Sequence, residues 1–156
     1  MKKKMKKIVS AFLLFAMVMA SSVSIFAAEE EKFEYDGIVF EIADREVIWG
    51  NARDFNALGE ALLITGHYGD NSKTCAHAIT RTYGKECLLT AKVSCMDIVG
   101  NITSSPVASK NYATSVMSGL ISPKNSYGGE YFGHHSIMDP DINVVFQKDT
   151  YIDLRG

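Results

Sequence analysis

The strongest constraint on the fold is a stretch of chain in which apolar and polar side chains alternate. In CLLTAKVSC, residues 87–95, every odd position is small or apolar, whereas Thr90, Lys92 and Ser94 lie between them. A period of two sends alternate side chains to opposite faces of a β-strand. The pattern therefore predicts a strand with one buried face and one face in water.

Further runs rich in β-branched and aromatic residues are separated by glycine, proline or Asp/Asn turn residues. They span residues 37–42, 46–49, 61–68, 111–121, 129–138 and 143–154. Short strands at this spacing, without a long segment of helical period, are typical of antiparallel sandwiches and barrels. We expect an all-β fold, an antiparallel β-sandwich or partly open barrel of about six to eight short strands.

One stretch fits a helix better than a strand. Phe55, Leu58 and Leu62 fall on one side of a helical projection, and Asn51 is a residue type that caps helices. The alternative to a pure β fold is therefore an α+β fold with one short helix near residues 51–60.

The first 28 residues have the parts of a secretory signal helix. A head with five lysines leads into IVSAFLLFAMVMA, and small residues at Ala27 and Ala28 precede three glutamates. An uncleaved anchor would need the serines that follow the apolar run to reach the roughly twenty residues of a membrane span. We expect cleavage, secretion and no stable membrane anchor. The short lysine-rich head indicates a bacterial protein.

What remains after cleavage is enough for one domain of ordinary size. We assign residues 1–28 to the secretory signal peptide, 29–35 to a charged, flexible lead-in and 36–156 to a single β domain. The signal holds five of the 16 basic residues and none of the 18 acidic ones, so the secreted part carries a net charge of −7. An acidic surface repels phosphate backbones and anionic lipid. We therefore expect an extracellular or cell-wall partner of unknown identity, and no nucleic acid.

All three cysteines lie within residues 73–95, on two runs that flank a Tyr-Gly-Lys-Glu turn. If these runs form a hairpin with a three-residue loop, Cys75 lies opposite Cys95. Opposed residues are within or close to the reach of a disulfide, and secretion permits one. We predict a Cys75–Cys95 disulfide, with Cys87 buried near the turn.

The sequence gives little support for a metal site or a catalytic nucleophile. His77 shares a strand face with Cys75, but no second close pair of ligands accompanies them, as a zinc site would require. His134 and His135 are adjacent in a predicted strand, so their side chains point to opposite faces. Ser136 lies in no nucleophile motif. We predict no metal, no cofactor and no enzyme activity.

The segment DPDIN begins like an oxygen-ligand calcium loop. Asp139, Asp141 and Asn143 have the right spacing, but Val144 stands where glycine is needed and Thr150 where glutamate is needed. An ordinary turn is the simpler interpretation, and a calcium site is left open.

Aromatic residues offer the other candidate site. Tyr127, Tyr131 and Phe132 surround two glycines and form a candidate ligand-contact loop. The alternative is that their rings fold onto the core, where we also expect Trp49. The leading hypothesis is a small, secreted, acidic β-sandwich with a binding or structural role at the cell surface or in the medium. The alternative is a secreted antimicrobial, bacteriocin-like or toxin-like protein.

Overall fold

The computed structural model describes residues 31–50, 57–69 and 72–156. The chain divides into two units, Met1–Glu31 and Lys32–Gly156, and the second contains all the elements below. The described residues form ten strands. They are β1 (Lys32–Tyr35), β2 (Ile38–Trp49), β3 (Ala57–Tyr68), β4 (Lys73–Thr82), β5 (Cys87–Asp97), β6 (Ile102–Ser104), β7 (Ala108–Ala113), β8 (Ser115–Met117), β9 (Gly129–Asp139) and β10 (Val144–Asp153).

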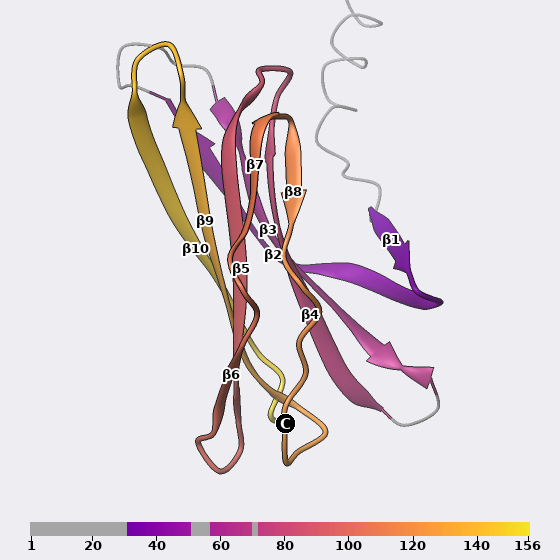
Figure 1. Ribbon diagram of the computed structural model, residues 1–156. Helices are drawn as coiled ribbons and strands as arrows, with labels where there is room; N and C mark the ends of the chain where they lie inside the picture. Colours follow the sequence, from indigo (N-terminus) through magenta and orange to yellow (C-terminus); the bar gives the residue numbers. More distant parts are fainter. Residues whose placement is uncertain (1–30, 51–56, 70–71) are drawn as a thin grey trace, which may run out of the picture. The chain divides into compact units, whose positions relative to one another are not determined.

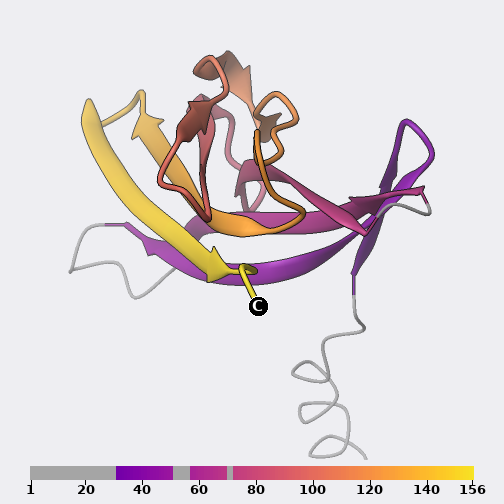
Figure 2. The same cartoon turned by 90° about the horizontal axis from the view of Figure 1, so that it is seen from below.

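The strands form two antiparallel sheets (Figure 1). Sheet A has the order β1-β2-β3-β4-β8, and it curls strongly around one side (Figure 2). Sheet B has the order β10-β9-β5-β6, with β7 also paired to β5. The predicted all-β sandwich is confirmed, although the strands are more numerous and several are longer than expected. Residues 32–35 of the predicted flexible lead-in form β1, which pairs with the start of β2.

The alternation in β5 matches its environment. Its odd-numbered side chains, from Cys87 to Cys95, are almost completely buried between the sheets, whereas Thr90 and Lys92 are partly exposed. The inter-sheet core also takes Leu63 from β3, and Tyr131 from β9 is among its largest members. The predicted wet face is confirmed at Thr90 and Lys92 but not at Ser94, which is buried and hydrogen-bonded to Ser104.

β3 is buried on both faces, which explains why its sequence does not alternate. Ala61 and Leu63 belong to the inter-sheet core, whereas Leu62 and Ile64 belong to a second apolar cluster on the other face of sheet A. An apolar run of this kind resembles a helix in sequence, since neither face is polar. The helix considered near 51–60 is not formed at residues 57–60, which begin β3, and residues 51–56 lie outside the described residues.

The predicted hairpin of the cysteine segment is wrong. β4 pairs with β3 and β8, whereas β5 pairs with β9, β6 and β7, so the short turn between them passes from one sheet to the other. Cys75 belongs to the outer cluster of sheet A and Cys95 to the inter-sheet core. The structure has Cys75, Cys87 and Cys95 as free, buried thiols, and the predicted Cys75–Cys95 disulfide is not formed. A short loop suits a crossing between packed sheets as well as a hairpin, and the sequence does not distinguish the two.

One long connection covers the edges of both sheets. β6 and β7 share one edge of β5, and Ser105 between them accepts and donates hydrogen bonds with the backbone of Val93. The chain then changes sheet at Thr114, whose carbonyl accepts the N–H of Thr82, and β8 continues along the edge of β4. The edges of β5 and β4 are thereby paired, and the short strands β6, β7 and β8 form the sheet edges on this side instead.

The opposite side is closed differently. β10 lies against β2, but its ladder is formed with β9 alone. A register shift in β2 precedes Asp44, whose carboxylate accepts the N–H of Tyr151 at 2.8 Å. Lys148 adds a 3.4 Å contact to Glu46. Side chains rather than a backbone ladder therefore join β10 to β2.

Two further observations complete the fold. The expectation that Trp49 lies in the core is wrong. Trp49 is the last residue of β2, and 57% of its surface is exposed. Among the helices of the described residues, none has the length and apolar character needed to cross a membrane.

Candidate binding face on sheet B

The outer surface of sheet B is organised in rows that run across β5, β9 and β10. Because opposed residues in antiparallel strands point to the same face, the register brings side chains from distant parts of the chain side by side. The rows on the outer surface are Thr90–Ser136–Gln147, Lys92–His134–Asp149 and Ser94–Phe132–Tyr151. We call this surface the binding face.

The first row supplies hydroxyl and amide groups. Thr90 Oγ1 and Ser136 Oγ are 2.5 Å apart and share a hydrogen bond, and Gln147 is exposed beside them on β10. Hydroxyl groups both donate and accept hydrogen bonds, and a glutamine amide has two donors and an acceptor. This row can therefore donate hydrogen bonds to a ligand and accept hydrogen bonds from it.

The second row carries charge. His134 Nδ1 lies 2.9 Å from Asp149 Oδ1, and the carboxylate can only accept, so Nδ1 donates the hydrogen bond. Both side chains are more than half exposed. Lys92 lies on the other side of His134, and none of the described residues forms an ion pair with it. Its ammonium is available to an acceptor on a ligand.

The third row is aromatic. The rings of Phe132 and Tyr151 are tilted against each other with centroids 5.0 Å apart. Tyr151 is 46% exposed and Phe132 partly buried, so the pair presents an apolar patch beside the charged row. Polar groups and an apolar patch thus adjoin on one surface.

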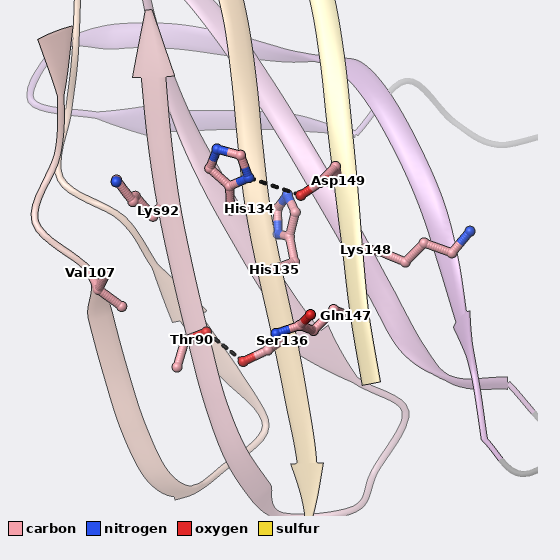
Figure 3. A pocket seen from close by; sticks show the side chains of 9 residues that line it. All are labelled: Thr90, Lys92, Val107, His134, His135, Ser136, Gln147, Lys148 and Asp149. Atoms are coloured by element: carbon pink, nitrogen blue, oxygen red, sulfur yellow. Dashed lines mark hydrogen bonds and ion pairs between the residues drawn. The ribbon is translucent and has the colours of Figure 1, made fainter. Parts of the chain in front are cut away.

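The two polar rows line a concavity of about 600 Å³ (Figure 3). Val107, from the segment between β6 and β7, forms the wall on the β5 side. Lys148 points away from the other lining side chains, toward β2, where it contacts Glu46 (Figure 3). The concavity is open, so its lining side chains reach solvent.

Directly beneath the binding face lies a buried histidine. His135 Nε2 is 2.9 Å from Thr150 Oγ1, and His135 Nδ1 is 3.0 Å from Thr80 Oγ1. Thr80 donates its own hydrogen to the carbonyl of Thr90 at 2.7 Å, so it accepts from Nδ1. Burial lowers the pKa of His135 to about 4, and the neutral ring is therefore the form at neutral pH.

Gly133 makes room for this histidine. A Cβ at Gly133 would lie 2.3 Å from Thr150 Oγ1 and 2.6 Å from His135 Nε2. Both atoms belong to the hydrogen-bonded network of the inner side, so no side chain fits there without breaking it. The absence of a side chain at this position is a packing requirement.

The three aromatic residues of the predicted contact loop do not share one surface. Tyr131 is fully buried, and its hydroxyl lies 2.7 Å from Thr74 Oγ1. Tyr127 is exposed and lines a different concavity with His67 and Thr74. Phe132 alone lies on the binding face.

The other candidate ligands also have identifiable surroundings. His77 Nδ1 donates to the carbonyl of Ser118 at 2.9 Å and packs against Phe40. The ammonium of Lys85 lies within 2.6 Å of both Asp139 oxygens and 2.8 Å from Asp141 Oδ2. A lysine ammonium therefore lies between the two carboxylates of the turn in which calcium was considered. No cluster of metal-binding side chains is found among the described residues.

The arrangement favours binding over nucleophilic catalysis. Ser136 shares its hydrogen bond with Thr90, whereas His134 is bonded to Asp149, so serine and histidine are engaged with different partners. A nucleophile needs a base within hydrogen-bonding reach.

Sequence reasoning found parts of this face but did not assemble them. Thr90 and Lys92 were placed on a wet face, and His134 was separated from His135, both correctly. Gln147, Asp149 and Tyr151 were missed. The two-residue period of their own strand was their only signal, since nothing in the sequence says which strands are neighbours.

Comparison with protein families and with curated proteins finds no match to this chain.

Proposed function

We propose that this is a secreted binding protein that takes a hydroxyl-rich glycan, in the cell wall or the surrounding matrix, on the binding face. The observation that carries the proposal is the convergence of two polar rows and an aromatic pair on one open surface. Pockets for small apolar ligands are enclosed and mostly apolar, and this surface is neither. A sugar chain offers many hydroxyl groups and apolar ring faces, which match the two kinds of row.

Secretion is the second part of the proposal. It is supported by the lysine-rich head, the apolar run and the alanine pair that precede residue 29. The full chain expressed in a secreting bacterium should yield protein in the medium whose mass corresponds to a start at Glu29. Retention of residues 1–28 on cell-associated protein would contradict it.

The binding test uses the protein from the medium, insoluble peptidoglycan with its attached wall polymers, and a panel of immobilised polysaccharides. We expect saturable binding to at least one glycan. Tyr151→Ser should weaken that binding about tenfold, because it removes the exposed ring of the aromatic pair. Lys92→Gln should weaken it about fivefold through loss of a charge-assisted hydrogen bond.

Matched controls are available on the same sandwich. Tyr112→Ser removes an exposed tyrosine of β7, and Lys110→Gln removes an exposed lysine of the same strand; neither residue lines the concavity. Both should bind as the parent does. No binding to any glycan, or equal loss in face and control variants, would overturn the proposal.

A further inference from the structure

The acidic residues are distributed very unevenly along the chain. From residue 98 to residue 129 there is no Asp or Glu, although 18 acidic residues occur elsewhere after the predicted signal. We call residues 98–129 the acid-free segment. It forms β6, β7 and β8 and covers the edges of both sheets (Figure 1).

The acid-free segment also exposes aliphatic side chains at one end of the sandwich. The turn between β5 and β6, at the lower end in Figure 1, carries Ile98 and Val99, and Ile102 follows it. Their exposed fractions are 60%, 67% and 70%, among the highest of the large apolar residues described. Three such side chains on one turn form an apolar tip, defined by Ile98, Val99 and Ile102.

The apolar tip is held in shape by a buried carboxylate. Asp97 is 1% exposed, and its Oδ1 accepts the N–H of Val99 at 3.0 Å and of Asn101 at 2.8 Å. Its Oδ2 accepts the side-chain amides of Asn101 and Asn125, each at 3.1 Å. Gly100 has a φ of +87°, which glycine adopts without strain. The turn is thus preorganised, and its carboxylate is enclosed by donors.

Positive charge lies beside the tip. Lys73 and Lys124 line a concavity of about 640 Å³ together with Ile102 and Asn101. Within residues 31–50, 57–69 and 72–156, no carboxylate forms an ion pair with either lysine.

The carboxylates in the neighbouring row share a single arginine. Glu130 and Asp153 lie in the row after Asp97 on sheet B, and both pair with Arg155. Lys73 and Lys124 balance the carboxylates around the tip, so this end lacks the excess negative charge of the whole secreted part.

We propose that the apolar tip and its two lysines dock on an anionic membrane surface. Aliphatic side chains on a rigid turn can enter the boundary between headgroups and acyl chains, while Lys73 and Lys124 contact lipid phosphates. Lys73 and Lys124, which pair with no described carboxylate, complement the phosphates of anionic lipid, and the adjacent aliphatic tip suits its acyl region. The net charge of −7 sets the opposite expectation for the protein as a whole, so the docking is confined to this end.

The test measures sedimentation of the protein with vesicles of equal parts phosphatidylglycerol and phosphatidylcholine, and with phosphatidylcholine vesicles. We expect binding to the anionic vesicles that weakens as salt is raised. Ile98→Ser with Val99→Ser should reduce the partition coefficient at least tenfold. Lys73→Gln and Lys124→Gln should each reduce it about fivefold, near 1 kcal/mol per lysine.

Control variants separate the tip from general surface effects. Val145→Ser removes an exposed aliphatic residue of β10, and Lys110→Gln removes one positive charge on β7. Both should partition as the parent does. Equal binding to both kinds of vesicle, no binding, or equal losses in tip and control variants would overturn the proposal. So would a dimer in vesicle-free solution that Ile98→Ser with Val99→Ser dissolves, because the tip would then bind a second copy.

Discussion

Two adjacent histidines of β9 lie in opposite environments. His134 points outward, is half exposed and pairs with Asp149, whereas His135 points inward and is enclosed between two threonine hydroxyls. One residue of chain separates a group that can meet a ligand from a group that holds the sandwich together. The strand's two-residue period therefore divides sheet B into a buried inner side and a solvent-facing outer side, for which we propose glycan binding.

Polar atoms on the two sides of sheet B meet their hydrogen-bonding requirements differently. On the inner side, polar atoms must be satisfied within the protein, since an unpaired buried donor or acceptor costs about 1–3 kcal/mol. On the outer side, water satisfies them, so Lys92 and Gln147 can remain without a partner until a ligand arrives. Changes on the inner side should alter stability, and changes on the outer side should alter binding.

The largest effect should come from filling the space beside His135. Gly133→Ala forces a methyl group onto Thr150 and the histidine ring, and we expect a loss of about 3 kcal/mol in the free energy of unfolding, measured by urea denaturation. Gly119→Ala is the matched control, because its Cβ would meet Ser105 at an ordinary 3.6 Å. Equal stability of the two variants would show that the inner side tolerates change as the outer side does.

The second-largest effect should be a loss of folding stability at acid pH, caused by the buried histidine of the inner side. The pKa of His135 is about 4 in the folded protein against 6.5 in the unfolded chain, so the unfolded state takes up a proton first as pH falls. Stability is therefore full above pH 6.5 and is lost between about pH 6.5 and 4, by up to roughly 3 kcal/mol. Burial also lowers the pKa of His77, which adds a loss of the same sign.

Urea denaturation across this pH range measures the effect. His135→Gln should flatten the pH dependence and leave the part that belongs to His77. Asp97 and Asp139 have pKa values lowered from 3.8, so their contributions are lost at lower pH. An unchanged slope in His135→Gln would refute the assignment of the acid sensitivity to the inner side.

The smallest change in stability should come from the outer histidine. His134→Gln breaks an exposed hydrogen bond to Asp149, and exposed polar pairs contribute about 0–1 kcal/mol, so we expect a shift within about 0.5 kcal/mol. Glycan binding should fall several-fold in the same variant. If His134→Gln instead unfolded the protein while binding stayed intact, the two sides would not be separable.

The sequence predicts the class of fold and the two faces of individual strands, but not which strands are neighbours. The alternation of residues 87–95 was sufficient to assign the buried side of β5. Its pairing with β9 depends on contacts between segments some forty residues apart, for which the chain has no local signal. The hairpin and the disulfide were wrong for the same reason, since Cys75 and Cys95 could be related only through an assumed register.

Local patterns also mislead where the environment is unusual. Leu58 and Leu62 fit a helical projection although both lie in β3, and Trp49 looks like a core residue because large aromatic rings usually are buried. The binding face combines residues that are individually ordinary for a solvent-facing strand. It becomes recognisable only when the three strands are aligned.

The joint between β2 and β10 has a mechanical consequence. A backbone ladder ties β10 to β9, but only side chains such as Asp44 tie it to β2. A force that draws Gly156 away from the sheet would load the β9–β10 hydrogen bonds one after another, like a zipper. Strands β3, β4 and β5, which are paired along both edges, would have to shear many bonds at once. The sandwich is thus anisotropic under tension, and its C-terminal strand yields before β3, β4 and β5 do.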